Sequence, residues 1–326
     1  MDFSNFRNGS HLAFINAASS PEVKYVTRPS LIEGIPDSIL GLIAPVAIYW
    51  LMSTFFLIID HYELSEKYRI HPSEEEAQKN KATFHEILKD VALQHFIQTV
   101  AGLGLFYFED VPLTGFENHA MWEWKQKLPF LPSWAIYHLY WYGFSAIKIV
   151  IAFGIIDSWQ YWLHRWMHIN KYMYKHYHSR HHRLYVPYAF GALYNAPLEG
   201  FLLDTCGTGF AMLLTNLTPR EALVLFTFST MKTVDDHCGY AFPYDPFQII
   251  FPNNSIYHDI HHQAFGIKTN FSQPFFTFWD TLNGTQYKDL TKYQEHRKKM
   301  SIEKYKQFLA DRRKPAAKPT EEKKEK

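Results

Sequence analysis

The 326-residue chain has only two cysteines, Cys206 and Cys238, and almost no surplus charge. Two thiols cannot supply a disulfide framework or a cysteine-rich zinc module. The 33 Lys and Arg residues nearly balance the 32 Asp and Glu residues, for a net charge of +1. This balance argues against nucleic acid as the main partner, because phosphate binding needs a basic surplus. Residues 1–33 have no short apolar core behind a basic start, so we expect no cleaved signal peptide.

Long apolar runs are the most prominent feature of the first half of the chain. Residues Ile39 to Ile59 form 21 consecutive positions without a charge, and about 20 apolar residues suffice to cross the hydrocarbon layer as a helix. The alternative is a buried helix of a soluble core. A second run, Val91 to Phe108, is interrupted by three polar side chains, and a third extends from about Ala135 to Ile156. These runs predict several membrane-spanning helices.

The region from Val186 to Val234 is apolar but is broken by several Pro and Gly residues. We expect a helical hairpin that enters the bilayer without a simple crossing. Lys and Arg residues are more frequent in 60–90 and after about 164 than in 111–133. The positive-inside tendency therefore places the first two regions in the cytosol and the N-terminal segment in the lumen.

Histidines are concentrated in short motifs of the second half. The motifs HRWMH, HSRHH and HDIHH, with a single histidine in DDHCGY, contain nine of the 18 histidines. Residues i, i+3 and i+4 share one face of a helix, so each HxxHH predicts three imidazoles on one face. An isolated histidine could be an ordinary buried polar residue. Together, however, the nine predict metal binding by His164, His168, His178, His181, His182, His237, His258, His261 and His262.

The ligand type and number limit the choice of metal. Imidazole is a good ligand for Zn, Fe, Cu and Ni. Nine imidazoles are too many for a single tetrahedral zinc ion, which takes three or four ligands. They are enough for two metals that each keep an open position.

At these motifs the sequence resembles the fatty acid hydroxylase/sterol desaturase superfamily of membrane di-iron oxygenases. The flanking segments HHRLYVPYAFGALYN, TMKTVDDHCGY and NNSIYHDIHHQAFGIKTNFSQPFFTFWD are most similar to the fungal sphingolipid C4-hydroxylases, and the resemblance is close over roughly 157–280. It implies two Fe²⁺ ions held by the nine histidines, and insertion of one oxygen atom from O₂ at C4 of sphinganine or dihydroceramide. The product would be phytosphingosine or its ceramide.

The resemblance also implies a source of electrons and a location. Electrons would come from NAD(P)H through cytochrome b5 and its reductase, and the sequence itself has no dinucleotide-binding GxGxxG motif and no haem-attachment motif. The terminal residues 323–326, KKEK, resemble the dilysine signal that retrieves membrane proteins to the endoplasmic reticulum.

The chain departs from the superfamily pattern at two positions. Thr233 and Ala196 occupy places where some relatives have a histidine or, at the second place, an asparagine. Neither can be assumed to ligate, so the number of ligands on each metal stays open.

Several carboxylates accompany the histidines. Asp157, Asp235, Asp236 and Asp259 are near ligand candidates in sequence, and we expect them either to orient imidazoles through the second ring nitrogen or to be ordinary solvated charges. Glu199 and Asp204 interrupt an apolar region, where a carboxylate is a functional candidate. They are candidates for binding the amine or hydroxyls of the substrate, and helix capping is the alternative role.

Together these features predict an all-α, multi-pass integral membrane helical bundle with a cytosolic His-rich di-metal cap. We expect an N-terminal segment 1–33, transmembrane helices in 34–163, a catalytic region 164–290 that includes the hairpin, and a tail 291–326. Alternatives are a sterol desaturase or sterol methyl oxidase on the same scaffold, or a His-rich metal transporter. The sequence leaves open whether the chain forms a homo-oligomer.

Overall fold

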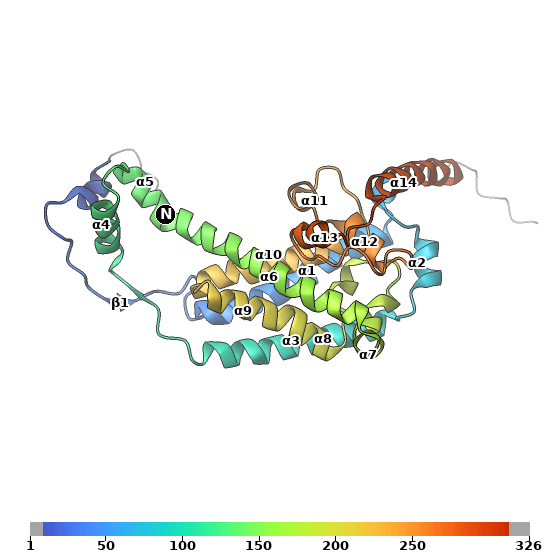
Figure 1. Ribbon diagram of the computed structural model, residues 1–326, viewed down its shortest axis with the longest axis horizontal. Coiled ribbons are helices and arrows are strands. Elements are labelled where there is room, and N and C mark those ends of the chain that lie inside the picture. Colours follow the sequence, from blue (N-terminus) through green and yellow to red (C-terminus); the bar gives the residue numbers. More distant parts are fainter. Residues whose placement is uncertain (1–8, 313–326) are drawn as a thin grey trace, which may run out of the picture.

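The computed structural model describes residues 9–312, so the dilysine-like end lies outside the described residues. The described chain is mostly helical (Figure 1). Two short strands, β1 (Val26–Thr27) and β2 (Leu113–Thr114), pair antiparallel. The helices are α1 (Asp37–His61), α2 (Ser73–Lys79), α3 (Phe84–Phe106), α4 (Glu117–Lys127), α5 (Ser133–His138), α6 (Phe144–Ile169), α7 (Lys171–His176), α8 (Pro197–Gly200), α9 (Gly207–Leu214), α10 (Pro219–Asp236), α11 (Pro246–Ile250), α12 (Ser255–His262), α13 (Phe278–Asn283) and α14 (Leu290–Arg312).

Two helical segments of the described chain are long and apolar enough to cross a membrane. They are α1 and the continuous stretch Ser133–Ile169, in which a π-helical turn joins α5 to α6. Only 22% and 17% of their most apolar windows are buried inside the protein, whereas the core helix of a soluble protein would be mostly buried. Large apolar side chains such as Leu51 and Phe55 instead point outward. An outward apolar surface of this extent indicates contact with lipid, and the protein is a membrane protein.

The second predicted run lies in α3, which begins earlier than expected, at Phe84. The Thr83 hydroxyl caps this helix by accepting a hydrogen bond from the Glu86 N–H. The charged first turns and the polar positions Gln94 and Gln98 leave α3 less apolar than α1. It is therefore not among the two helices that meet the length and apolarity of a crossing.

The Pro- and Gly-interrupted region folds as a helical hairpin. Its first arm is α8, a π-helical turn (Phe201–Cys206) and α9, and its second arm is α10. The turn closes with Asn216 in the left-handed region, at φ +48°, which asparagine tolerates better than most residues. Thr218 then caps α10, with Pro219 in the first turn and Glu221 completing a capping box.

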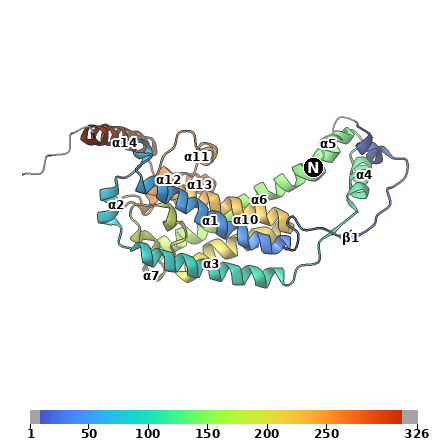
Figure 2. The same ribbon diagram turned by 180° about the vertical axis from the view of Figure 1, so that it is seen from behind.

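The long helices run between two ends of an elongated molecule (Figures 1 and 2). One end carries β1, α4 and α5, and the other carries α2, α7, α12 and α14. α1 packs along α10, and α6 packs against α9. Two apolar clusters hold this bundle together, one around Tyr49 and Val91 and the other around Phe153, Phe251 and Phe275. All the histidine motifs lie near the second end, because α6 and α10 both finish there.

Candidate metal centre

Four separate segments bring the nine histidines to one place. His164 and His168 lie on the last two turns of α6, and His237 directly follows α10. The 3₁₀-helical turn His178–Arg183 carries the HSRHH motif. The HDIHH motif lies on α12, whose first turn is capped by the Asn254 side chain accepting a hydrogen bond from the Tyr257 N–H at 3.0 Å. Eight of the nine imidazoles are buried, and His182 is half-buried.

The nine side chains form two groups whose potential ligand atoms lie within 4.8 Å of one another. Each HxxHH motif is divided between the groups. Its first and last histidines join one group and its middle histidine joins the other, which differs from the predicted single face of three imidazoles. The five-histidine group contains His164, His168, His178, His182 and His261, and the four-histidine group contains His181, His237, His258 and His262.

The outer ring nitrogens of most of these imidazoles are hydrogen-bonded to backbone carbonyls. His164 Nδ1 is 2.8 Å from the Phe271 oxygen, and His262 Nδ1 is 2.7 Å from the Leu184 oxygen. The same contact joins His181 to Tyr194, His237 to Thr233 and His261 to Thr269. A carbonyl can only accept, so Nδ1 carries the proton and Nε2 of a neutral ring presents a lone pair.

These Nε2 atoms face one another inside each group. The distances are 3.1 Å for His164–His178 and 3.0 Å for His178–His182 in the first group, and 3.0 Å for both His237–His258 and His258–His262 in the second. The buried Nε2 of His261 has no hydrogen-bond partner within residues 9–312. Lone pairs held this close repel one another, and a shared cation removes the repulsion.

The geometry of both groups suits a metal ion. Imidazole nitrogens about 2.0–2.1 Å from one ion lie about 2.9–3.4 Å apart for octahedral to tetrahedral angles, which matches the observed separations. Burial lowers the pKa of His181 to about 4 and of His237 to about 3, so both rings are neutral near pH 7, the form that binds metal. The chain therefore has two adjacent all-imidazole donor sets.

The four aspartates expected to orient imidazoles contact other groups. Asp157 accepts hydrogen bonds from the Phe275 and Phe276 N–H groups, at 3.0 and 2.6 Å. Asp259 accepts from Tyr293 at 2.7 Å and contacts His71 at 2.8 Å.

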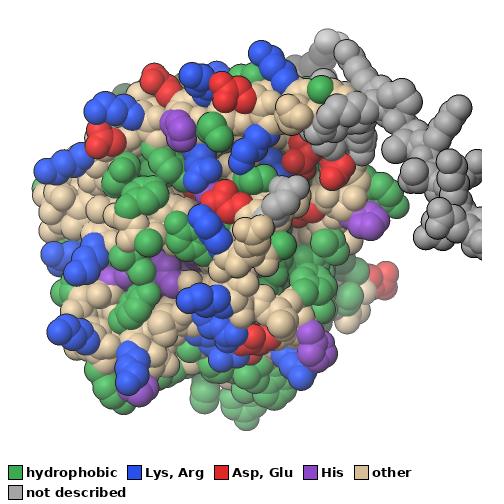
Figure 3. Space-filling model, turned by 90° about the vertical axis from the view of Figure 1, so that its right-hand side faces the viewer, with side chains coloured by type: hydrophobic (Ala, Val, Ile, Leu, Met, Phe, Trp, Pro, Cys, Tyr) green, Lys and Arg blue, Asp and Glu red, His purple; other side chains and the backbone are tan. Residues whose placement is uncertain are grey.

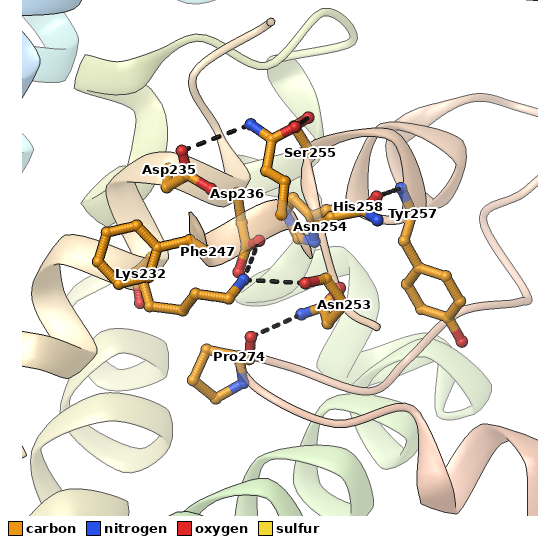
Figure 4. A network of polar contacts seen from close by, with 12 residues as sticks. Lys232, Asp235, Asp236, Phe247, Asn253, Asn254, Ser255, Tyr257, His258 and Pro274 are labelled. Atoms are coloured by element: carbon orange, nitrogen blue, oxygen red, sulfur yellow. Dashed lines mark hydrogen bonds and ion pairs between the residues drawn. The ribbon is translucent and has the colours of Figure 1, made fainter. Parts of the chain in front are cut away.

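The other two belong to the network of Figure 4, which links α10 to the loop before α12. Asp236 pairs with the buried Lys232, which also donates to the Asn253 carbonyl at 3.0 Å, and Asp235 lies 3.5 Å from Gln248 Nε2. The contacts of all four aspartates fix loops and helices around the histidines.

Glu199 is the carboxylate that contacts a ligand candidate directly. It lies on α8, is buried, and accepts the hydrogen bond of His178 Nδ1. It thus takes, for His178, the part that backbone carbonyls take for five other histidines. The sequence interpretation placed Glu199 with the substrate, because spacing along the chain could not show that α8 abuts the turn 178–183.

Asp280 has a supporting part that the sequence interpretation missed. It accepts from the Phe271 and Ser272 N–H groups at 3.0 and 2.7 Å and from the Tyr257 hydroxyl at 2.8 Å. It thereby ties the segment whose Phe271 carbonyl holds His164 to the helix that carries the HDIHH motif. Asp280 lies 18 residues after the last histidine of the HDIHH motif, and nothing in the sequence around it indicates a supporting role.

A small cavity adjoins the donor sets, and a larger cavity shares part of its wall. The larger, of about 450 Å³, is lined mainly by apolar residues of α1, α3, α9 and α10. The smaller, of about 30 Å³, is lined by His178, His181, His237 and His258. Four residues line both: Gln160, Asp204, Thr233 and Pro274. Asp204 thus lies between an apolar cavity and the imidazoles.

The outer face of this end carries many basic side chains. Figure 3 shows lysine and arginine side chains spread over the face, interspersed with aspartate and glutamate, and histidine visible among them. Lys171, Lys175 and Lys268 are among the exposed basic residues near the motifs. These three lysines give the part of the face next to the histidine motifs a positive charge.

Comparison with known proteins identifies the class of this fold and site. Residues 149–285, which contain all four histidine segments, match the family model of the fatty acid hydroxylases. No solved structure matches the chain.

The relatives narrow the class. The chain is 56% identical over 300 residues to sphingolipid C4-hydroxylase SUR2 of Saccharomyces cerevisiae, covering 92% of this chain and 86% of that protein. It is 46% identical to sphingolipid C4-hydroxylase sur2 of Schizosaccharomyces pombe (81% and 94% covered) and 43% identical to sphinganine C4-monooxygenase 1 of Arabidopsis thaliana (77% and 88% covered). The chain belongs to the family of sphingolipid C4-hydroxylases and is an oxidoreductase of that family, which confirms the resemblance drawn from its motifs.

Proposed function

We propose that the chain is a di-iron monooxygenase that hydroxylates C4 of sphinganine or dihydroceramide and so forms phytosphingosine or phytoceramide. The observation that carries the proposal is the pair of donor sets, in which buried Nε2 atoms face one another at 3.0–3.2 Å. The names of the fungal and plant relatives support the substrate.

The nine histidines would hold the two ions, five at one site and four at the other. Bound iron would supply the redox chemistry needed to attack an unactivated C–H bond, which no side chain can supply. Glu199 keeps the proton of His178 on Nδ1, and the carbonyl of Phe271 does the same for His164. These contacts hold the imidazoles ready for metal and raise their basicity.

The reaction needs electrons from outside the chain. One atom of O₂ enters the C–H bond, the other leaves as water, and the balance requires two electrons and two protons. NAD(P)H would provide the electrons through a reductase and cytochrome b5. The exposed lysines next to the histidine motifs, Lys171, Lys175 and Lys268, would contact acidic side chains of the electron carrier.

The membrane arrangement completes the proposal. Segment 1–33 would be lumenal, and α1 and Ser133–Ile169 would cross the bilayer within the region 34–163. The hairpin α8–α10 and α3 would be partly embedded. The histidine end and the tail 291–326 would lie on the cytosolic side of the endoplasmic reticulum membrane. α2 and α7 belong to the two regions rich in Lys and Arg that the positive-inside tendency assigns to the cytosol, and both lie at that end (Figure 1).

The test is lipid mass spectrometry on cells that lack their own C4-hydroxylase. Cells that express the chain should regain 4-hydroxylated long-chain bases, and cells that express His261→Ala should not. His176→Ala is the matched control, since His176 is an exposed histidine outside both groups, and it should restore the product. Purified protein should contain about two iron ions per chain, because nine imidazoles exceed the needs of one site.

Other lipid products would overturn the assignment. Altered sterols without hydroxylated long-chain bases would identify a sterol oxidase on the same scaffold. Metal uptake into vesicles without any lipid product would identify a transporter.

A further inference from the structure

The wall between the two cavities contains an unusual carboxylate. Asp204 is the only Asp or Glu among the described residues that line the larger cavity, and no Lys or Arg lines it. Gln160 Nε2 donates a long hydrogen bond, of 3.4 Å, to Oδ1 of this carboxylate. Within residues 9–312 no Lys or Arg forms an ion pair with Asp204. A carboxylate at the edge of an apolar cavity is costly without a cation or hydrogen-bond donor.

Neighbouring polar groups at this wall also lack partners. The buried Thr205 hydroxyl lines the same cavity and has no hydrogen-bond partner in the described part of the chain. The same is true of the Ser229 hydroxyl, on α10. Unpaired buried hydroxyls are uncommon in folded proteins. The lining of this mainly apolar cavity therefore includes a carboxylate and two hydroxyls that lack a strong partner among the described residues, as does the buried imidazole of His95.

The rest of the large cavity suits a hydrocarbon chain. Leu42 and Val46 come from α1, Leu105 and Phe106 from α3, and Phe210 from α9. A ligand with one polar and one apolar end would place its chain among these residues and its polar end at Asp204. The smaller cavity beyond Asp204 leads to His178, His181, His237 and His258.

The chemistry of the substrate, which rests on the function proposed above, selects the polar end. In a free long-chain base, C4 is two carbons from C2, which carries the ammonium group, and next to C3, which carries a hydroxyl. A pose that brings C4 to the imidazole groups keeps the ammonium group within two carbons of them, and Asp204 lines the small cavity together with four of these histidines. We propose that Asp204, aided by Gln160 and Thr205, is a head-group subsite that pairs with this ammonium and makes the enzyme select the free long-chain base over its N-acylated form.

The N-acylated form would lose this pairing. Its nitrogen is a neutral amide, which offers one N–H and no charge to the carboxylate. An ionised partner makes a hydrogen bond roughly twice as strong as a neutral one. The subsite is therefore a determinant of specificity that acts by binding, independently of the oxygen chemistry.

Binding can be measured without turnover, using purified full-length protein in nanodiscs under argon. Displacement of radiolabelled sphinganine should show that unlabelled sphinganine binds more tightly than N-acetylsphinganine. In Asp204→Asn the affinity for sphinganine should fall about 10- to 100-fold, and the affinity for N-acetylsphinganine should change less than about threefold. Asp204→Glu should recover part of the loss. Asp289→Asn, the same substitution at an exposed aspartate outside both cavities, should bind both ligands like the unaltered protein.

The outcomes separate this inference from the proposed function. Equal loss of both ligands in Asp204→Asn would mean a structural role, and no loss of either would mean that the head group binds elsewhere; both results overturn the subsite. Turnover measured in air with a reducing system tests the function itself. Charge-dependent binding without any hydroxylated product would leave the subsite standing and overturn the oxygenase proposal.

Discussion

The buried Lys232 offers the sharpest test of how the region behind the metal groups is stabilised. Its side chain is 0% exposed, pairs with Asp236 and donates to the Asn253 carbonyl. Asp236 immediately precedes His237 and lines the small cavity. Lys232→Met would keep most of the volume but leave Asp236 buried without its cation. Breaking a buried ion pair in this way costs about 3–5 kcal/mol.

The loss should be visible as a lower unfolding temperature in detergent. For a chain of this size we expect a fall of roughly 6–20 °C, taking about 2–4 °C per kcal/mol as a guide. The double variant Lys232→Met/Asp236→Asn should regain much of the loss, because the uncompensated charge is gone. Lys268→Met, at an exposed lysine, should melt like the unaltered protein. A single Lys232→Met variant that melts within a degree of it would refute the reasoning.

Three further predictions concern the supports of the histidine groups. Glu199→Gln should lower iron affinity about 10- to 100-fold, as loss of a group that orients a metal ligand does, measured by competition with a chelator; unchanged affinity would mean that Glu199 does not orient His178. Gly266→Ala should disturb α12 and abolish iron binding, because a Cβ there would lie 1.9 Å from the Ile260 carbonyl oxygen, whereas Gly104→Ala meets open space and should be silent; equal iron content in both would contradict this. Tyr293→Phe removes the 2.7 Å hydrogen bond to Asp259 and should cost about 1 kcal/mol, read as a small fall in melting temperature without loss of iron.

The sequence picks out the nine histidines that the structure brings together, but it does not show their division into two groups. Spacing of i, i+3 and i+4 places His258, His261 and His262 near one face of a helix, and they do lie on α12. Spacing cannot show that the HSRHH motif forms a 3₁₀-helical turn, or that this turn packs against α12. Because of this packing, the middle histidine of each motif joins the group of the other motif: His261 lies with His178 and His182, and His181 lies with His258 and His262.

The supporting groups were the least predictable part. Five histidines are held by backbone carbonyls, and every residue has a carbonyl, so no residue type marks these positions. Sequence proximity to the motifs predicts a role for four aspartates in orienting imidazoles, yet Asp157 holds a loop more than a hundred residues away. α3 illustrates the same limit for membrane segments. Its polar side chains Gln94 and His95 are buried, and the sequence does not show that α1 and α8 pack against this helix.

The crossed arrangement of the two HxxHH motifs has a consequence for folding. Each donor set takes histidines from both the 178–182 turn and α12, so neither set is complete until these segments, about 80 residues apart, have packed together. Free energy from metal binding then contributes to that packing, because ligand sets absent from the unfolded chain add their binding energy to folding. The carbonyl of Leu184, which follows the first motif, holds His262 of the second, and the same packing therefore fixes both the position and the protonated nitrogen of the ligands. A change that separates the two segments should empty both sites at once, whereas replacing a single histidine should affect mainly its own.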